Sequence, residues 1–452
     1  MDDGAPRRPE VWRPGVDGMD EDEELEYDPT VYDCLHAWSL EWPCLSFDVV
    51  RDELGEDRTH FPHSMFMVAG TQALSAEQNA LAVMRLTRLK KTRRKEKDPA
   101  GDPDDSDASE SDSSDDEGGV GGLAGDGPLL RVRKIAHHGA VNRVRCMPQR
   151  SSIVATWSDA GVVQVWDTAK QLRELMSTVD DAGVEKRAAA RVAPRFAFTG
   201  HADEGYAIDW SPVVEGRLVS GDNQGVIHVV EPREGGWSAD ASAGRRGGHG
   251  GASVEDAQWS PAERDVFASC GGDGRVCVWD ARVGSGAPAL GVRAHDCDVN
   301  VMSWNRKVNY MLATGADDGG LRIWDLRSFA GSDSKKESFV ANFQFHRAPV
   351  TSVEWARFDG AMLASSAADH TVCVWDLAVE RDAEEEAAAM AAEGNNAVAP
   401  EDLPPQLMFV HQGLRDPKEI HWHHQIPGMC LTTAADGFNA FKAYNVGNEV
   451  VA

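Results

Sequence analysis

Two groups of residues in this sequence have the side chains of a hydrolytic triad, which combines a hydroxyl nucleophile, a histidine base and a carboxylate. Both groups have the order histidine, hydroxyl, aspartate, tryptophan at the same spacing: His295, Thr314, Asp318 and Trp324, then His346, Ser365, Asp369 and Trp375. A catalytic site is rarely built several times in one chain. The repetition therefore favours a structural relay of hydrogen bonds, from the turn aspartate through the histidine and the hydroxyl to the indole N–H. We expect neither enzyme activity nor a cofactor.

A metal site is the second chemical possibility, because the run HWHH at residues 421–424 contains three histidines. However, His421 and Trp422 occupy the places that Ser303 and Trp304 hold in another unit of an internal repeat, which favours strand and loop histidines over metal ligands. The 8 cysteines include no Cys-x-x-Cys pair, which argues against a zinc site or a disulfide framework. We expect no metal and a reducing compartment.

The internal repeat is a block of 20 residues that positions all of these side chains. The first and last residues of the blocks are Cys146 and Trp166, Trp210 and Val230, Trp259 and Trp279, Trp304 and Trp324, and Trp355 and Trp375. Each block is typical of three short strands joined by Gly-Asp turns, and a fourth strand precedes the next histidine. Such units form propeller blades, in which each small sheet packs only against its neighbours.

Seven blades are predicted for the whole chain. A sixth unit begins at Trp422 and ends at Phe441, and another blade is assembled from residues 45–86. The stretch YDPTVYDCLHAWSLEW, residues 27–42, is predicted to form a helix. The expected fold is therefore all-β: a seven-bladed WD40 β-propeller with a short N-terminal helix and disordered acidic segments.

Acidic segments separate and flank the blades. Residues 2–26 have ten acids and three arginines, residues 98–117 ten acids and no base, and residues 380–402 eight acids and Arg381, giving −7, −10 and −7 of the net −29. Segments so poor in apolar residues stay disordered. The predicted divisions are an acidic disordered N-terminus (1–26), a helix and first blade ending in a basic run (27–97), an acidic disordered linker (98–127), and blades two to seven (128–446) with an acidic insertion (380–402).

The acidity indicates a basic partner, and it disfavours direct binding to nucleic acid or an anionic membrane. The tract DPDDSDASESDSSDDE is predicted to shield basic cargo with nine carboxylates: Asp102, Asp104, Asp105, Asp107, Glu110, Asp112, Asp115, Asp116 and Glu117. Three serines precede an acid by three residues, the pattern of acidophilic kinase sites, and are candidate phosphorylation sites: Ser109, Ser113 and Ser114. The alternative is a solubilising linker.

Two further motifs each have two interpretations. The basic run RLTRLKKTRRKEK, residues 85–97, is either a solvated linker or a candidate nuclear import signal centred on Lys90, Lys91, Arg93, Arg94 and Lys95. The Trp-Asp-x-Arg box of ubiquitin-ligase substrate receptors occurs twice, as Trp279, Asp280 and Arg282 and as Trp324, Asp325 and Arg327. Most such matches only keep a blade-ending arginine. No signal peptide or apolar run of 18 residues is found, so we expect a soluble, non-secreted protein.

Longer stretches between about residue 27 and residue 446 resemble one family. They include YDCLHAWSLEWPCLSFDVVRDELGEDRT, AGTQA, IDWSPVVEGRLVSGDNQGVIHVVEP and WDLAVERD, and they are similar to the glutamate-rich WD-repeat proteins, also called regulators of ribosome biosynthesis. A looser likeness, in EWP and AGTQA, links that family to the histone-binding subunits of chromatin assembly factors. The sequence departs from the family in its short acidic N-terminus and in Val230-Glu231, where Trp-Asp is expected.

The resemblance implies a ribosome biogenesis factor. Its expected role is that of a nucleolar chaperone, which binds and shields a newly made basic large-subunit ribosomal protein and delivers it to pre-ribosomes. A monomer in the nucleus and nucleolus is expected, with shuttling to the cytoplasm left open. Two alternatives stay open: a histone-binding chaperone in chromatin assembly, and a substrate receptor that contacts the adaptor of a cullin-type ubiquitin ligase.

Overall fold

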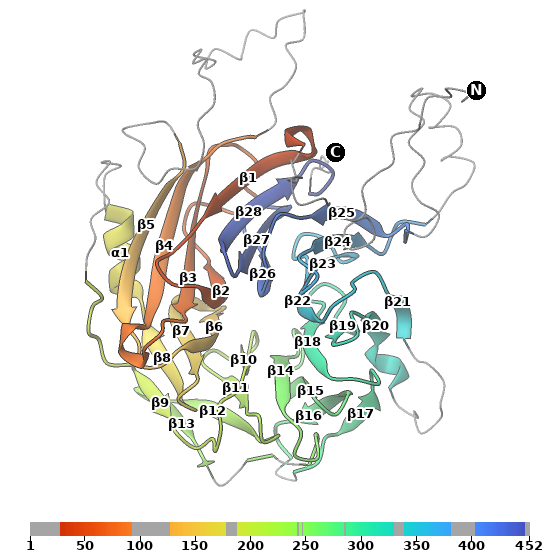
Figure 1. The fold of residues 1–452 in the computed structure, drawn as a ribbon. Coiled ribbons are helices and arrows are strands. Elements are labelled where there is room, and N and C mark those ends of the chain that lie inside the picture. The colour runs from red at the N-terminus through yellow and green to blue at the C-terminus, as the bar shows by residue number, and fades with distance from the viewer. Residues whose placement is uncertain are drawn as a thin grey trace, which may run out of the picture.

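Strands dominate the computed structural model, which describes residues 28–92, 127–177, 188–241, 244–245, 247–283, 286–329, 339–380 and 403–447. The described strands form seven four-stranded antiparallel sheets arranged in a ring (Figure 1). The predicted all-β, seven-bladed propeller is confirmed. Except for Gly127 and Glu380, the predicted acidic segments 1–26, 98–127 and 380–402 lie outside the described residues.

The blades are numbered in chain order, and their strands are given from the innermost outward. Blade 1 has β2 (Cys44–Val50), β3 (His63–Thr71), β4 (Ala80–Leu89) and β5 (Leu129–Ala136); blade 2 has β6 (Val141–Met147), β7 (Arg150–Ser158), β8 (Val163–Asp167) and β9 (Phe196–Phe198). Blade 3 has β10 (Ala207–Trp210), β11 (Leu218–Gly221), β12 (Ile227–Arg233) and β13 (Gly236–Ala239); blade 4 has β14 (Val254–Trp259), β15 (Val266–Gly271), β16 (Arg275–Asp280) and β17 (Leu290–Arg293). Blade 5 has β18 (Val299–Trp304), β19 (Met311–Ala316), β20 (Leu321–Asp325) and β21 (Phe339–Phe343); blade 6 has β22 (Val350–Trp355), β23 (Met362–Ala367), β24 (Val372–Asp376) and β25 (Leu407–His411). Blade 7 has β26 (Glu419–Trp422), β27 (Met429–Ala434), β28 (Gly437–Ala443) and β1 (Tyr32–Trp38).

The first blade extends further along the chain than its predicted boundary at residue 97. Strand β5 pairs with β4 over a long register that runs from Thr87 opposite Leu129 to Ala80 opposite Ala136. The acidic linker therefore connects the third and fourth strands of one blade and does not separate two blades. The predicted boundary is wrong because the basic run was taken as the end of the blade.

The predicted N-terminal helix is also wrong over most of its length. Only Pro29–Val31 forms a helical turn, of the 3₁₀ type, with the Asp28 carboxylate accepting the Thr30 N–H at 2.8 Å. The next residues form β1, which pairs with β28 and places Leu35 opposite Phe441. Without β1, the outer edge of β28 would expose unpaired backbone groups, and an unpaired edge favours strand over helix. The two ends of the propeller chain thus close the ring within blade 7.

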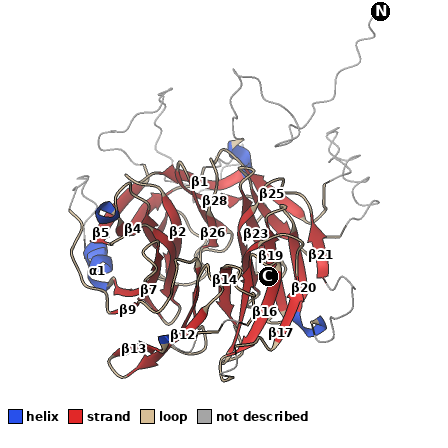
Figure 2. Cartoon of the chain, turned by 60° about the horizontal axis from the view of Figure 1, so that its bottom comes forward, coloured by secondary structure: helices blue, strands red, loops and turns tan. Residues whose placement is uncertain are grey.

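Helical structure is sparse between the strands (Figure 2). The 3₁₀ turns Ala76–Gln78 and Leu326–Ser328 lie in loops, and the one described α-helix is α1 (Ala169–Ser177). Its buried Leu172 and Leu175 pack with Ile135 of β5, and Arg133 pairs with Glu174 at 3.2 Å. Helix α1 was not predicted from the sequence. It connects β8 to β9 while covering the side of blade 1, so it fastens two blades together.

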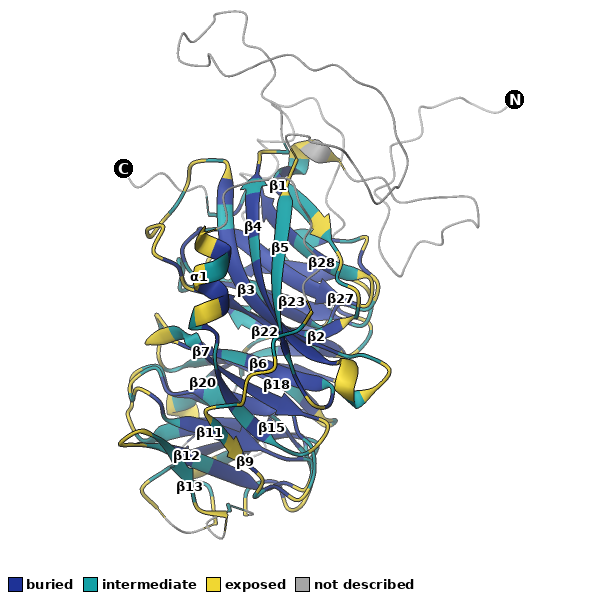
Figure 3. Cartoon of the chain, turned by 90° about the vertical axis from the view of Figure 1, so that its left-hand side faces the viewer, coloured by how far each residue is buried: buried dark blue, intermediate teal, exposed yellow. Residues whose placement is uncertain are grey.

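Burial decreases from the innermost strands to the rim of the ring (Figure 3). The third strands carry the block-ending tryptophans, and Trp279, Trp324 and Trp375 are at most 2% exposed. These rings lie in separate apolar clusters, one of which joins Trp324 of blade 5 to Ala268 and Val276 of blade 4. Since burying such a large side chain contributes several kcal/mol, the tryptophans bond neighbouring blades into one ring.

Hydrogen bonds connect the histidine, hydroxyl and tryptophan of blade 6. His346 Nδ1 lies 3.2 Å from Asp369 Oδ2, and His346 Nε2 lies 2.7 Å from Ser365 Oγ. The Trp375 indole N–H donates to the same Ser365 oxygen at 2.9 Å. Burial alone would raise the pKa of Asp369, but the bond from His346 outweighs it and lowers the pKa to about 2. The carboxylate therefore stays charged and orients the ring.

Blade 5 has only part of this arrangement. His295 Nε2 and the Trp324 indole both lie 2.9 Å from Thr314 Oγ1, but His295 Nδ1 has no hydrogen-bond partner among the described residues. Asp318 instead accepts the Gly320 N–H at 2.9 Å, and burial together with Arg322 lowers the pKa of His295 to about 4. The prediction that placed Asp318 in the relay is wrong, because its carboxylate is used to close its own turn.

Substitution of the two turn aspartates should separate these arrangements. Asp369→Ala orphans His346 and is expected to lower the free energy of unfolding by about 1–3 kcal/mol. Asp318→Ala, the matched control, removes one turn hydrogen bond and should cost less than about 1 kcal/mol. The measurement is urea unfolding of both variants beside the parent. Equal costs would show that the contact between Asp369 and His346 contributes nothing to stability.

Candidate functional site

The innermost strand of every blade has one edge that no further strand covers. Along this edge, a side chain of one blade accepts a backbone N–H of the next blade at 2.7–3.1 Å. The accepting residues immediately precede the block-starting position, and the donors start the next block. The pairs are Asp48 with Cys146, Asp209 with Trp259, Gln258 with Trp304, Ser303 with Trp355, and Glu354 with Trp422.

A second set of contacts lies two residues earlier along the same strands. Here too a side chain accepts a backbone N–H of the following blade, at 2.8–3.2 Å. The pairs are Ser46 with Val144, Asp256 with Met302, Ser352 with Ile420, and Glu419 with Phe47. These two sets, here called the capping contacts, satisfy donors that would otherwise face the axis of the ring without a partner.

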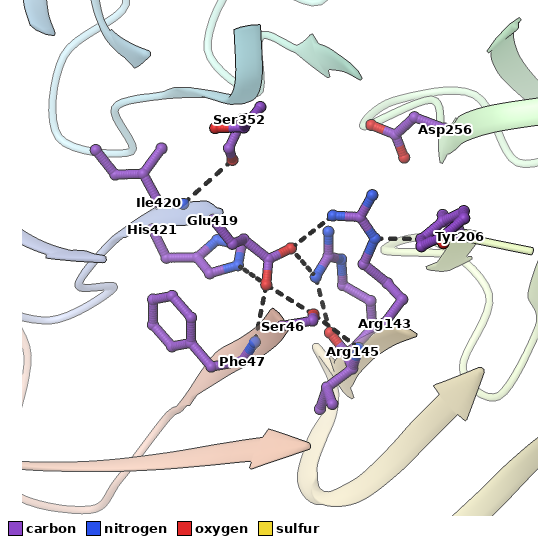
Figure 4. A network of polar contacts seen from close by, with 12 residues as sticks. Ser46, Phe47, Arg143, Arg145, Tyr206, Asp256, Ser352, Glu419, Ile420 and His421 are labelled. Carbon is purple, nitrogen blue, oxygen red and sulfur yellow. Dashed lines mark hydrogen bonds and ion pairs between the residues drawn. The ribbon is translucent and has the colours of Figure 1, made fainter. Parts of the chain in front are cut away.

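Glu419 is the centre of the most strongly charged part of this arrangement (Figure 4). Its buried carboxylate accepts from Arg143 at 2.9 Å and from Arg145 at 2.8 Å, and its other oxygen accepts from Ser46 Oγ at 2.7 Å. Arg143 also donates to the carbonyl of Tyr206 at 3.1 Å. One carboxylate from blade 7 is thus connected to blades 1, 2 and 3.

The charges of this network support one another. Burial would raise the pKa of Glu419, but Arg145, His421 and Arg143 outweigh it and hold that pKa well below its usual value. Burial would lower the pKa of His421, but the carboxylates of Glu354 and Glu419 raise it to about 10. His421 Nδ1 lies 3.0 Å from Glu354 and its Nε2 lies 3.5 Å from Glu419. His421 is therefore a cation that joins two acids, which is a structural use of a residue in the HWHH run.

The network has no evident chemistry of its own. Among the described residues, no cluster of three or more histidines, cysteines or acids has the geometry to hold a metal ion. All eight cysteines are free, and burial raises the pKa of the Cys34 thiol to about 12 and that of Cys277 to about 11. Thiols with such pKa values are poor nucleophiles at neutral pH. The arrangement instead fixes the surfaces at the two ends of the ring axis.

One of these ends carries a dense set of carboxylates, here called the acidic rim. The rim lies on the loops that enter the innermost strands and on the turns between second and third strands, which meet because Asp317 N donates to Asp298 O at 3.0 Å and Asp159 N to Ala140 O at 3.0 Å. Its members come from blades 2 to 5: Asp159, Asp203, Glu204, Glu255, Asp296, Asp298, Asp317 and Asp318. All are exposed or half-buried.

The acidic rim surrounds a hollow of about 210 Å³ at this end of the ring. Its lining combines apolar Leu45, Val301 and Val350 with Tyr206 and Glu255. Burial raises the pKa of Glu255, a contact with Ser253 opposes this, and the carboxylates of Asp298 and Asp317 add to the increase. Carboxylates that repel one another in this way gain from a cationic neighbour. The hollow therefore suits a side chain that is both long and basic.

The residues predicted to act in targeting lie in different places. Lys90 and Lys91 are exposed just after β4, whereas Arg93, Arg94 and Lys95 lie outside the described residues. The shielding carboxylates of residues 102–117 and the three candidate phosphorylation sites, Ser109, Ser113 and Ser114, also lie outside them. The structure therefore brings none of these residues together with the acidic rim.

The two Trp-Asp-x-Arg boxes have the same local geometry. In each, the tryptophan is buried and the arginine is bonded to its own aspartate, Arg282 to Asp280 and Arg327 to Asp325, at 2.6 Å. Both arginine side chains are more than half exposed. Neighbouring blades thus present two matching Asp-Arg pairs on the surface, with Arg327 also lying 3.7 Å from the centre of the Tyr310 ring.

The capping contacts were missed from the sequence, although a signal exists. The residue before each block start is polar or charged in every blade: Asp48, Arg145, Asp209, Gln258, Ser303, Glu354 and His421. Strand positions that pack against an apolar neighbour are rarely polar in all repeats, so this pattern indicates a shared polar function. The acidic rim could not be found this way, because its members come from loops of different length.

Neutralising Glu419 should destabilise the ring. Glu419→Gln leaves Arg143 and Arg145 without their shared buried counter-ion, and breaking a buried pair from one side costs about 3–5 kcal/mol. Asp280→Asn is the matched control, because it removes a carboxylate from an exposed arginine pair and should leave the melting temperature close to that of the parent. The measurement is thermal unfolding. A Glu419→Gln variant that melts with the parent would show that the network does not hold the blades together.

Comparisons with known proteins agree with this architecture. A family model of the histone-binding protein RBBP4, a component of the CAF1 complex, matches residues 22–90, and a model of the WD domain, G-beta repeat, matches residues 244–280, 287–325 and 337–376. No described helix is long and apolar enough to cross a membrane.

Three curated relatives match almost the whole chain. "Protein HEAT STRESS TOLERANT DWD 1" of Arabidopsis thaliana is 48% identical over 97% of this chain and 92% of its own length. "Ribosome assembly protein rrb1" of Schizosaccharomyces pombe is 43% identical over 95% and 84%, and "Glutamate-rich WD repeat-containing protein 1" of Dictyostelium discoideum is 45% identical over 98% and 87%. With this identity along a shared seven-bladed ring, the chain belongs to the family of glutamate-rich WD-repeat proteins and ribosome assembly protein rrb1.

Proposed function

We propose that this protein is a ribosome biogenesis factor of the nucleus and nucleolus, which binds and shields a newly made basic large-subunit ribosomal protein and delivers it to pre-ribosomes. The observation that carries the proposal is the acidic rim around the hollow at one end of the ring. Membership of a family that includes a ribosome assembly protein supports it. A protein made to bind RNA carries many lysines and arginines, and carboxylates can occupy them until RNA replaces the chaperone.

Two surfaces would share this task. The acidic rim is held by rigid blades, so it can select the shape of one segment of the cargo. The tract at residues 102–117 is a flexible polyanion that would cover further basic surface without a fixed geometry. Phosphorylation of Ser109, Ser113 or Ser114 would add about −1.5 to −2 charges at each site and strengthen the covering. Binding of this kind needs no catalytic step, so the protein would act without enzyme activity.

Salt should regulate the release of the cargo. An exposed ion pair contributes about 0–1 kcal/mol, so the affinity must come from several rim carboxylates acting together with the apolar wall of the hollow. The Debye length falls from about 10 Å at 0.1 M salt to about 3 Å at 1 M, which weakens the charged contacts but not the apolar ones. Contacts that are individually weak stay reversible, as delivery to RNA requires.

Histone binding is the second candidate function. The observation that favours it is the match of residues 22–90 to a histone-binding family model, which covers β1 and the first three strands of blade 1. Histones are basic as well, so the acidic rim would also suit them. The two candidates differ in location on the ring, since the matched segment lies in blades 7 and 1 whereas the rim lies on blades 2 to 5.

The ligase-receptor alternative has its own structural support. It rests on the two exposed Asp-Arg pairs, Asp280 with Arg282 and Asp325 with Arg327, on neighbouring blades. Purification of the endogenous complex at moderate salt would distinguish the three possibilities by the partner recovered: a ribosomal protein, core histones or a ligase adaptor. Recovery of histones or of an adaptor without a ribosomal protein would contradict the proposed chaperone function.

A charge-neutral rim should bind the cargo more weakly. The triple variant Asp296→Asn, Asp298→Asn and Asp317→Asn removes three exposed carboxylates from the acidic rim. We expect the affinity for the purified basic ribosomal protein to fall roughly tenfold at about 0.1 M salt, with a smaller effect at 1 M. The matched control, Glu53→Gln, Glu234→Gln and Glu263→Gln, changes the net charge equally on exposed loops away from the rim.

Binding is measured by titration at both salt concentrations. An equal loss of affinity in the rim variant and in the control would show that net charge, and not the rim, attracts the cargo. A third arm lacks residues 102–117 and tests the tract: it should fold normally but let bound cargo precipitate or capture stray RNA at low salt. Undiminished solubilisation by this arm would leave the tract as a linker.

A further inference from the structure

Four neighbouring blades carry a basic residue at the end of the ring axis opposite the acidic rim. Each lies two residues after the block-starting position, just beyond the innermost strand: Arg51 after β2, Arg306 after β18, Arg357 after β22 and His424 after β26. These four strands are consecutive around the ring (Figure 1). The other three blades have a proline at the same place: Pro148, Pro212 and Pro261. The four basic residues are here called the basic arc.

The basic arc lines a cavity of about 120 Å³ at this end of the ring. A water molecule occupies about 30 Å³ of liquid, so the cavity has room for about four waters. Such a space suits a compact ion and excludes a folded protein segment. All four members of the arc are among the residues that line it.

Two guanidinium groups of the arc lack the partners that buried or clustered arginines normally have. Arg306 makes no hydrogen bond or ion pair with any described residue. Arg357 has an Nε that is buried without a hydrogen-bond partner, and its nearest carboxylate, Glu354, is 3.9 Å away. By contrast, Arg143 and Arg145 inside the same ring both bond to Glu419 within 3 Å. A buried N–H of a cation that is left unmade is costly, so its presence points to a missing anion.

Repulsion within the arc supports this interpretation. Burial lowers the pKa of Arg357 to about 10, and the nearby charge of Arg306 adds to the decrease. Burial lowers the pKa of His424 well below its usual value, and Arg357 is the largest of its charged neighbours. His424 is therefore neutral at neutral pH and can donate one N–H. Bringing a negative charge between these groups would remove the repulsion.

The acids of the same cavity do not neutralise the arc. Asp48, Asp209 and Glu354 line it, but each carboxylate accepts a backbone N–H from the next blade. Glu354 also bonds to His421 at 3.0 Å. Burial raises the pKa of Asp209 to about 7, so this group is only partly charged at neutral pH. The acids are thus committed to capping the strands.

We propose that the basic arc is a binding site for a small, multiply charged oxyanion of the pyrophosphate type. Arginine forks bind such oxygens through paired N–H groups, and Arg306 and Arg357 on adjacent blades can each offer a free fork to one ligand. His424 supplies a neutral donor beside them, and Arg51, paired with Glu56 at 2.8 Å, lies at the edge. Bound anion would join blades 5, 6 and 7 at the end of the ring that the acidic rim does not serve.

The test uses the intact chain and inorganic pyrophosphate, measured by calorimetric titration at about 0.05 M salt, where screening is weak. We expect saturable binding in the parent and at least a tenfold loss of affinity in the double variant Arg306→Gln and Arg357→Gln. The matched control, Arg150→Gln and Arg264→Gln, removes the same charge from exposed arginines at the same end of blades 2 and 4. It should bind as the parent does.

Several results would overturn the proposal. They are an absence of saturable binding by the parent, undiminished binding by the arc variant, or an equal loss in the arc and control variants. Thermal unfolding without ligand gives an independent check. If the arc is a site awaiting an anion, its double variant should melt at or above the parent temperature, because repulsion is relieved. A lower melting temperature would show instead that Arg306 and Arg357 are structural partners of the nearby acids.

Discussion

Each blade of this ring has an innermost strand with an uncovered edge, and the need to satisfy that edge governs much of the structure. A side chain of one blade accepts a backbone N–H of the next, as when Glu354 accepts from Trp422 and Asp48 from Cys146. An unpaired buried N–H costs about 1–3 kcal/mol, so these contacts are stabilising and also directional. They place carboxylates along the axis, and those carboxylates require the cations Arg143, Arg145 and His421.

The same constraint explains why the two ends of the axis differ. Inside the ring, acids and bases are paired and leave little net charge, so the surface character is set by loops that the capping contacts hold in place. On one side these loops present the acidic rim of blades 2 to 5, and on the other they present Arg306 and Arg357. A ring with opposite charges at its two ends can bind a basic protein and a small anion at once, without competition between them.

The sequence predicted the ring and its seven blades, because the 20-residue spacing between tryptophans such as Trp304 and Trp324 is a property of local strand lengths. It failed where pairing between distant residues decides the structure. Residues 32–38 form β1 because β28, about four hundred residues later, offers an open edge. Asp318 matches Asp369 in spacing, yet only Asp369 reaches its histidine. The acidic rim was not predicted, since it forms only when loops of four blades meet.

Backbone hydrogen exchange of the intact chain, alone and bound to a basic large-subunit ribosomal protein, tests the docking surface most directly. If the acidic rim receives the cargo, exchange should slow in the loops at residues 201–206, 295–300 and 316–320. Residues beyond β18 and β22, around Arg306 and Arg357, should exchange at unchanged rates. Unchanged exchange in the rim loops, with protection confined to β1 and blade 1, would contradict docking on the rim and would favour the segment that resembles histone-binding proteins.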